Sequence, residues 1–127
     1  MLEGKIQKQI IAFLKRKKVY HFRFQAQSNI NGVPDIICVY KGLFIGLELK
    51  QKNGRATDLQ KRKLDAINDA GGIGLIIYNK WEVELLFNML DEYENDLFGE
   101  MTVLTFRNRY NDRREYERNK AFKEWVL

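Results

Sequence analysis

Hydrophobic and polar residues recur along the first part of the chain with two different periods. Over 2–18 the apolar positions return every three or four residues, which predicts an amphipathic helix. Over 19–26 aromatic and polar residues alternate, which predicts a β-strand. The only histidine of the chain, His21, falls on the polar face of that strand. We interpret it as a hydrogen-bonded or solvated residue rather than as a base or metal ligand.

Two short apolar runs flank the dipeptide Lys41-Gly42, and this pattern predicts a β-hairpin with a two-residue loop. Residues paired across such a loop have numbers that sum to 83, so Asp35 is expected opposite Glu48. Directly opposed side chains project to the same face of the sheet, which Lys50 would share with Glu48. Two facing carboxylates repel each other unless a proton or cation lies between them. The spacing therefore predicts a divalent-cation site.

A strand, helix and strand are predicted to follow one another after the first hairpin strand. The polar loop 51–56 carries donors that can contact phosphates. Thr57 and Gln60 have the spacing of a capping box, which begins a helix over 57–70. The apolar run 73–78 is typical of a strand buried in a parallel arrangement. We expect a βαβ unit with a right-handed crossover.

The span 80–95 is predicted to be a third helix. We expect Trp81, Leu85 and Met89, with Phe87 and Leu90 beside them, to form its apolar side. A stripe of aromatic residues and methionine at this spacing is typical of a core.

The last part of the chain carries a weaker pattern. We expect a turn over 96–99, a short strand over 101–106 and a solvated helix over 107–127. Two alternatives remain for that densely charged terminal segment. It could bind a partner or form a dimer, or it could offer a basic surface to nucleic acid.

At 127 residues the chain is expected to form one domain, with a core over about 1–95 and an extension over about 96–127. The net charge is +5 and the isoelectric point is near 9.3, which points to a polyanionic partner. The charge is unevenly distributed, because residues 1–50 carry 9 Lys and Arg against 3 Asp and Glu. The segment 80–106 is acidic, with 1 Lys or Arg against 7 Asp and Glu.

The single cysteine, Cys38, has no partner for an internal disulfide, and its place in an apolar strand predicts a buried structural thiol. No apolar run is long enough to span a membrane. The first residues do not have the pattern of a signal peptide either. We expect a cytoplasmic protein.

Pro34-Asp35 is followed by Glu48-Leu49-Lys50, and Glu3 lies on the leading helix. This combination resembles the PD-(D/E)XK superfamily. More narrowly, the chain resembles the VRR-NUC (virus-type replication-repair nuclease) group, including its small stand-alone phage members. The resemblance covers about residues 3–90, and it includes the Gly-Arg pair, the helix carrying Gln60 and the Gly-Gly pair before the apolar strand.

The resemblance implies an α/β fold with a restriction-endonuclease-like αβββαβ core, in which helices flank a mixed central sheet, plus a C-terminal helical or strand extension. It also implies metal-dependent hydrolysis of phosphodiester bonds. Asp35 and Glu48 would bind Mg²⁺, or Mn²⁺ in its place, together with the backbone carbonyl of Leu49. Glu3 would complete or extend the site. The alternative for Glu3 is a surface acid favoured by the helix dipole.

Further roles follow from the same resemblance. Lys50 would orient or activate the attacking water, and Gln60 would support the site or the scissile phosphate. We expect Lys52, Arg55 and Lys61 to contact nucleic acid. The alternative for the charges of the hairpin is a surface salt-bridge cluster.

The expected function is that of a Mg²⁺-dependent, structure-specific DNA endonuclease of the kind used in DNA repair, with four-way (Holliday) junctions as the leading substrate. Because a domain of this size has little surface with which to recognise sequence, we expect it to recognise DNA shape and phosphates. Symmetrical cutting of a junction needs two sites, which predicts a C2 homodimer with an interface in the region after Asp96. The alternatives are a nuclease for flaps, nicked duplex or single strands, and a DNA-binding module without catalysis.

Overall fold

The computed structural model describes the backbone of residues 2–24, 31–94 and 101–126, and the side chains of 4–24, 31–94 and 101–121. The chain divides into two compact units, residues 1–83 and 84–127. Each unit is described by itself below.

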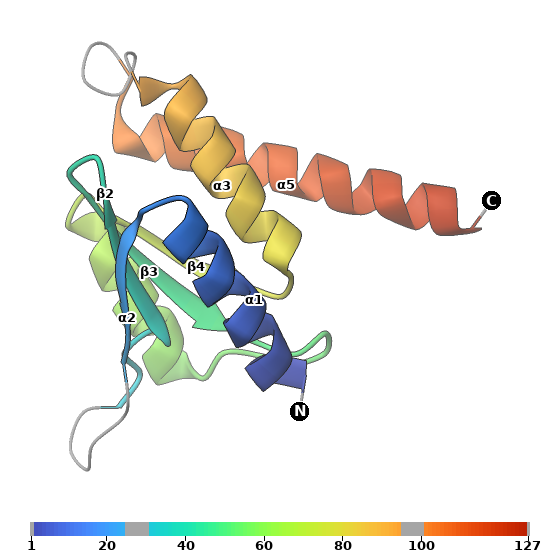
Figure 1. The fold of residues 1–127 in the computed structure, drawn as a ribbon, viewed down its shortest axis with the longest axis horizontal. Helices are drawn as coiled ribbons and strands as arrows, with labels where there is room; N and C mark the ends of the chain where they lie inside the picture. The colour runs from blue at the N-terminus through green and yellow to red at the C-terminus, as the bar shows by residue number, and fades with distance from the viewer. Residues whose placement is uncertain (1, 25–30, 95–100, 127) are drawn as a thin grey trace. The chain divides into compact units, whose positions relative to one another are not determined.

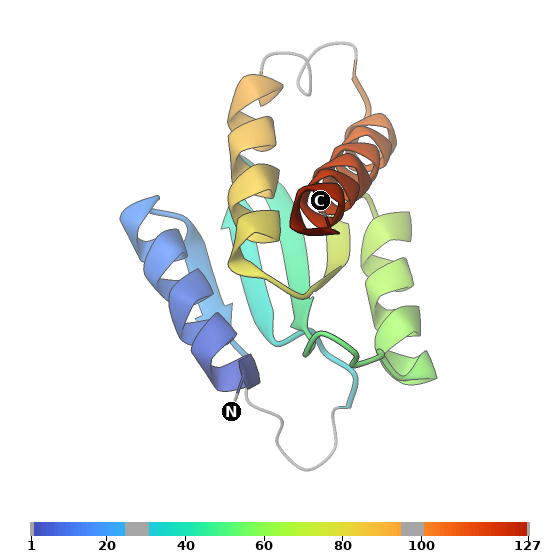
Figure 2. The ribbon, with the colours of Figure 1, turned by 90° about the vertical axis from the view of Figure 1, so that its right-hand side faces the viewer.

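The first unit contains α1 (Leu2–Arg16), β1 (Tyr20–Arg23), β2 (Ile36–Tyr40), β3 (Leu43–Leu49), α2 (Asp58–Asp69) and β4 (Ile73–Ile77), and α3 (Lys80–Glu92) begins at its end. The four strands form one sheet in the order β1-β2-β3-β4. The pairs β1·β2 and β2·β3 are antiparallel, and β3·β4 is parallel. Helices α1 and α2 lie on opposite sides of the sheet (Figures 1 and 2). The expected mixed sheet flanked by helices is confirmed.

Helix α1 ends two residues earlier than the apolar pattern predicts, because Lys18 takes a left-handed conformation with φ +60°. The N–H of Val19 donates to the carbonyl of Leu14 at 3.0 Å, and that of Lys18 donates to the carbonyl of Lys15 at 3.1 Å. These two hydrogen bonds form a Schellman motif, which satisfies carbonyls at the end of the helix. Leu14 is fully buried, as is Ile10 one turn before it.

The hairpin has the predicted two-residue loop. Lys41 and Gly42 have φ values of +51° and +82°, as a type I′ turn requires at both central positions. The register runs from Tyr40↔Leu43 to Ile36↔Leu47, so paired residues have numbers that sum to 83. The predicted register is confirmed.

The predicted capping box and βαβ order are also confirmed. The Thr57 hydroxyl accepts the N–H of Gln60, and the Gln60 side chain accepts the N–H of Thr57. Helix α2 then packs closely on the sheet at two glycines. A Cβ at Gly46 would lie 2.8 Å from Ile67 Cδ1, and a Cβ at Gly74 would lie 2.7 Å from the carbonyl oxygen of Leu64.

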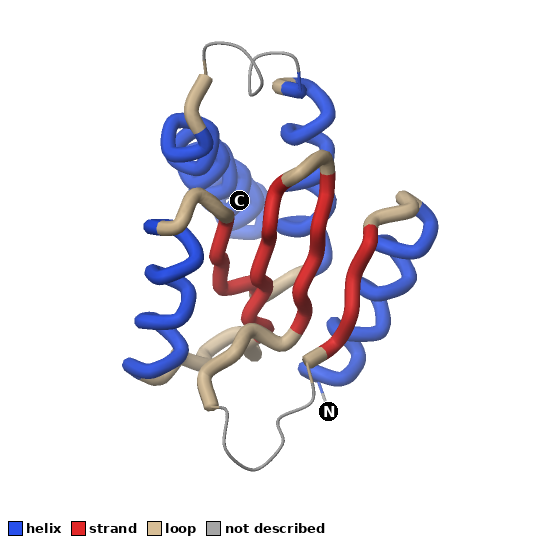
Figure 3. The backbone as a smooth tube through the Cα atoms, turned by 90° about the vertical axis from the view of Figure 1, so that its left-hand side faces the viewer, coloured by secondary structure: helices blue, strands red, loops and turns tan. Residues whose placement is uncertain are grey.

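Aromatic and aliphatic side chains remain exposed where α2 does not cover its side of the sheet. Tyr20 and Phe22 are 68% and 46% exposed, and Val39 and Phe44 are 41% and 45% exposed. Tyr20 pairs with Val39, which pairs with Phe44, so these side chains share one face across three strands. Figure 3 shows the backbone of the sheet from the side on which α2 lies. We call these four residues the open apolar face.

In the second unit, α5 (Val103–Val126) takes the place of the strand predicted over 101–106, so that prediction is wrong. The hydroxyl of Thr102 accepts the N–H of Thr105 at 3.1 Å, which is the hydrogen bond of a helix N-cap. Phe106 is fully buried, and its ring meets that of Tyr93 edge to face with centroids 6.1 Å apart. The turn predicted over 96–99 lies outside the described residues.

The buried stripe of α3 matches the predicted one only in part. Phe87, Met89 and Leu90 are buried as predicted, whereas Trp81 and Leu85 are only half-buried, and Val83 and Leu86 are fully buried in their place. Both sets repeat with a helical period, so periodicity alone could not choose between them. No helix within the described ranges is both long and apolar enough to cross a membrane.

Candidate active site

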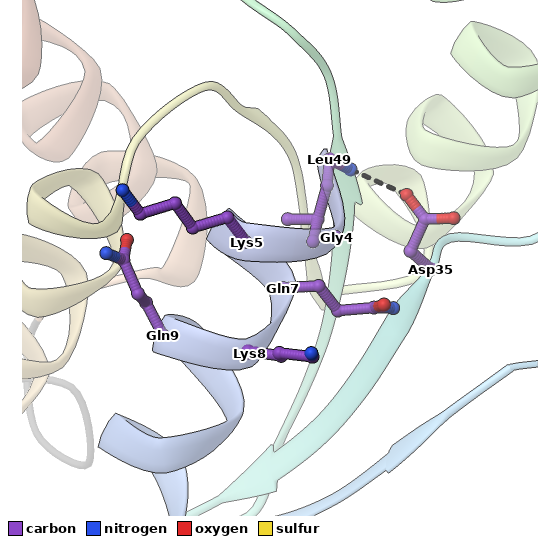
Figure 4. Close-up of a pocket in the computed structure, with 7 residues that line it drawn as sticks. All are labelled: Gly4, Lys5, Gln7, Lys8, Gln9, Asp35 and Leu49. Carbon is purple, nitrogen blue, oxygen red and sulfur yellow. Dashed lines mark hydrogen bonds between the residues drawn. The ribbon is translucent and has the colours of Figure 1, made fainter. Parts of the chain in front are cut away.

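Asp35 lies between Pro34 and the first residue of β2, where three strands come together. Its Oδ2 accepts a hydrogen bond of 2.8 Å from the backbone N–H of Leu49, at the end of β3 (Figure 4). Its backbone carbonyl accepts the N–H of Phe24, after β1, at 2.9 Å. Extending the hairpin register by one pair places Asp35 opposite Glu48. The side chain of Asp35 is therefore held at the end of β3, next to Glu48, which carries the second predicted carboxylate.

Glu48 is a buried acid near the end of β3, with only 2% of its surface exposed. Its Oε1 accepts a hydrogen bond of 3.1 Å from Gln60 Nε2 on the first turn of α2. Gln60 Oε1 accepts the N–H of Thr57 at 2.9 Å, which fixes which end of the amide faces Glu48. The capping box of α2 thus orients the side chain that holds this carboxylate.

The run before Asp35 packs against the beginning of α2. Gly32 has φ +80°, and a Cβ there would lie 2.8 Å from Leu59 Cγ, so a side chain would be both strained and crowded. Pro34 is buried, and its Cγ lies 2.9 Å from where a Cβ of Gly46 would be. Glycine and proline in this run therefore set the path by which the backbone reaches Asp35.

Lys50 follows β3 directly and is half-buried. Its N–H donates to the carbonyl of Ile77 at 2.9 Å, so the parallel pairing with β4 continues to this residue. Since side chains alternate along an extended chain, Lys50 and Glu48 project to the same side.

A cleft of about 720 Å³ opens beside Asp35 and is lined by Gly4, Lys5, Gln7, Lys8, Gln9, Asp35 and Leu49. Figure 4 shows the side chain of Gln7 extending towards Asp35, with Lys8 one residue further along α1 and Lys5 directed to the other side. The sequence interpretation missed Gln7 as a cleft residue. Its position four residues after Glu3, on the same face of the helix, is the signal that could have found it.

Glu3 lies in the first turn of α1. The residue that follows it, Gly4, lines the cleft. The side chain of Glu3 lies outside the described ones, so its predicted role as a ligand stays a prediction.

The three residues predicted to contact nucleic acid are exposed. Lys52 and Arg55 lie in the loop between β3 and α2, and Lys61 lies in the first turns of α2. The loop is held by a hydrogen bond of 2.7 Å from the N–H of Gly54 to the carbonyl of Gln51. All three can reach a ligand from the solvent side.

His21 and Cys38 lie outside this cleft. His21 Nδ1 is 2.8 Å from the carbonyl oxygen of Val19, as expected for a hydrogen-bonded histidine. Cys38 is fully buried in β2, and burial raises the pKa of its thiol to about 12. The prediction of a buried structural thiol is confirmed.

The donor set fits Mg²⁺. Carboxylate and carbonyl oxygens are hard ligands, and Mg²⁺ is usually held by one or two carboxylates while it keeps several waters. Asp35 and Glu48 would supply the two carboxylates, and the carbonyl of Leu49 belongs to the residue whose N–H binds Asp35. Across the side chains that the structure describes, no group of three or more His, Cys, Asp or Glu converges.

The fold matches that of a known group. A solved structure described as a VRR_NUC domain superposes with a TM-score of 0.61 at 18% sequence identity. The match covers 69% of this chain and 96% of that chain. No protein-family model matches the sequence, and no curated protein does. The fold expected from the motif residues is therefore confirmed.

Proposed function

We propose that the chain is a metal-dependent DNA endonuclease of the PD-(D/E)XK type. The observation that carries this proposal is the pair of acids, Asp35 and Glu48, at the end of the hairpin. Asp35 is bound to the N–H of Leu49, and the adjacent Glu48 is held by Gln60. The likeness to the structure described as a VRR_NUC domain supports the same conclusion, because this chain carries the residues by which it resembles that nuclease group.

Asp35, Glu48 and the carbonyl of Leu49 would hold Mg²⁺, or Mn²⁺ in its place, with Glu3 as a further ligand. When bound, the ion lowers the pKa of a coordinated water and stabilises charge that builds up on the phosphate. Lys50, projecting to the same side as Glu48, would orient that water or accept its proton.

The remaining residues of the site position these groups. Gln60 keeps Glu48 in place by its hydrogen bond, and the Leu49 N–H does the same for Asp35. Lys52, Arg55 and Lys61 would bind phosphates on either side of the cleavage point.

The leading substrate is a four-way (Holliday) junction. Its symmetrical resolution requires two active sites related by a two-fold axis, so the active form would be a homodimer. The open apolar face supports this assembly, because exposed apolar patches that span several strands are typical of interaction surfaces. Since a C2 interface uses the same patch on both copies, a second copy of this face is the natural occupant.

A cleavage panel tests the proposal. The protein is incubated with Mg²⁺ and a labelled junction, a flap, a nicked duplex, a linear duplex and a single strand of matched sequence. We expect paired, symmetrical cuts in the junction and slower cutting of the linear duplex. Equal cutting of junction and linear duplex would contradict the structure-specific part of the proposal.

The same panel separates the alternatives. If the protein cuts the flap, the nicked duplex or the single strand faster than the junction, that DNA is the preferred substrate in place of the junction. Binding without cleavage of every substrate, in Mg²⁺ and in Mn²⁺, would identify a DNA-binding module. The two acids at the hairpin end argue against that module, because carboxylates directed at a phosphate weaken binding in the absence of a cation.

A further inference from the structure

A second hollow adjoins the cleft at Asp35 and continues along α1. Its volume is about 220 Å³, and it is lined by Gln7, Lys8, Ile11, Ala12, Lys15 and Arg23. Gln7 and Lys8 also line the cleft, so the two hollows share a wall. We call the six lining residues the α1 groove. It leads from the candidate active site towards the edge strand β1.

Three cations line the α1 groove. Lys8 and Lys15 come from α1, and Arg23 comes from the end of β1, so positive charge stands on two of its walls. All three side chains are exposed. Over the described part of the chain, none of them forms an ion pair with a carboxylate. Because they are exposed, their charges can be reached by an anionic ligand from the solvent.

The spacing of these cations matches a nucleic-acid strand. Lys15 follows Lys8 by seven positions, which corresponds to roughly 10 Å along a helix. The phosphates of one strand of B-DNA are spaced by about 3.4 Å along the duplex axis, so this distance spans about three nucleotides along that axis. A strand that enters the cleft at Asp35 would therefore place phosphates about three nucleotides apart beside Lys8 and Lys15.

We propose that the α1 groove binds the backbone of a DNA strand and guides it to the site at Asp35. This inference rests on the proposed function, since it assigns the path of the nuclease substrate. Lys8, Lys15 and Arg23 contact phosphates, and Gln7, which lines both hollows, contacts the nucleotide nearest the cleavage point. None of the three cations belongs to the set predicted from the motif residues, so they form a separate binding surface.

The test measures DNA binding in Asp35→Asn protein, which separates binding from cleavage. Lys8→Ala, Lys15→Ala and Arg23→Ala are each added to this background, and fluorescence anisotropy with a labelled junction is recorded over a series of salt concentrations. Each lost phosphate contact should weaken binding and lower the salt slope, log K against log [salt], by about one. The matched control is Arg16→Ala, since Arg16 is an exposed cation of the same helix that lines neither hollow.

Salt slopes of all three groove variants equal to that of the Arg16→Ala control, in proteins with unchanged circular dichroism, would overturn the inference. Tighter binding of polyglutamate than of DNA to the same groove would also overturn it. Failure of the proposed function gives a different result. In that case the protein that keeps Asp35 would not cut DNA, although the groove variants would still lower the salt slope.

Discussion

Gln60 Nε2 donates a hydrogen bond of 3.1 Å to Glu48 Oε1, while Gln60 Oε1 accepts the N–H of Thr57 at 2.9 Å. One side chain thus completes the N-terminal cap of α2 and holds a buried carboxylate of β3. The cap and the candidate metal ligand are therefore joined through one side chain. Substitutions at Gln60 and at Thr57 can separate the contribution of Gln60 to the stability of the helix from its contribution to cleavage.

Gln60→Ala and Thr57→Ala are a matched pair for this purpose. Each removes one of the two hydrogen bonds of the capping box, which should lower the free energy of unfolding by about 0.5–2 kcal/mol. Only Gln60→Ala releases Glu48, so only this variant should lose cleavage, by about 10- to 100-fold as for other partners of metal ligands. Initial cleavage rates and thermal unfolding of both variants give the two quantities. Equal rates for the two variants would show that Gln60 acts only through the helix cap.

Asp35→Asn should remove activity while leaving the fold intact. The amide oxygen of Asn can still accept the N–H of Leu49, so the hydrogen bond is kept and the negative charge is lost. Loss of metal stabilisation worth several kcal/mol corresponds to a rate reduction of at least about 100-fold. Cleavage assays and a melting temperature within a few degrees of wild type would confirm this expectation. Undiminished cutting would refute the assignment of Asp35 as a ligand.

Lys50→Arg distinguishes two roles for the residue after β3. Arginine keeps the positive charge but does not give up its proton, so it can stabilise an anionic transition state but cannot act as a base. If Lys50 accepts the proton of the attacking water, Lys50→Arg and Lys50→Ala should both cleave about 10²- to 10⁴-fold more slowly than wild type. Substantial activity in Lys50→Arg alone would assign the electrostatic role. The control is Lys52→Ala, which should weaken DNA binding with a smaller effect on the maximal rate.

Local rules in the sequence predicted the parts of the site that depend on neighbouring residues. Lys41-Gly42 permits a type I′ turn, and that turn fixes the hairpin register, so the position opposite Glu48 followed directly. The spacing of Thr57 and Gln60 predicted the start of α2 for the same reason. These short-range signals are independent of how helices pack on the sheet.

Features that depend on packing were not predictable in this way. Alternation over β1 indicates a strand, but it does not show that α2 leaves Tyr20 exposed. Gln7 lines the cleft only because α1 crosses the sheet beside Asp35. The β-branched residues near Val103 favoured a strand, and the cap at Thr102 with the buried ring of Phe106 favoured the helix that forms.

Cys38 should make stability depend on pH in the alkaline range. The thiol has an ordinary pKa of 9.0, and burial raises it to about 12 in the folded chain. The unfolded state therefore loses its proton first as the pH rises, which favours unfolding. The stabilising contribution is complete below pH 9 and is lost between pH 9 and about pH 12, at up to about 1.4 kcal/mol per pH unit.

Denaturant unfolding of wild type and Cys38→Ala over this pH range measures that contribution. The difference between the two free energies of unfolding should shrink by several kcal/mol as the pH rises from 9 towards about 12. In the folded protein at pH 8 the thiol should also resist alkylation by iodoacetamide, because the thiolate is the reactive form. Rapid alkylation of the native protein would contradict the buried position.

Two charged substitutions locate the proposed dimer interface. Phe44 is 45% exposed on the open apolar face, and Leu104 is 56% exposed on α5, in the region after Asp96 where the sequence placed the interface. Lysine at a buried interface position would be desolvated without a partner, which costs several kcal/mol. We therefore expect Phe44→Lys to be monomeric in sedimentation velocity, with loss of paired cuts in a junction, while Leu104→Lys stays dimeric. The reverse result would place the interface on α5, and a monomeric wild type would refute the dimer.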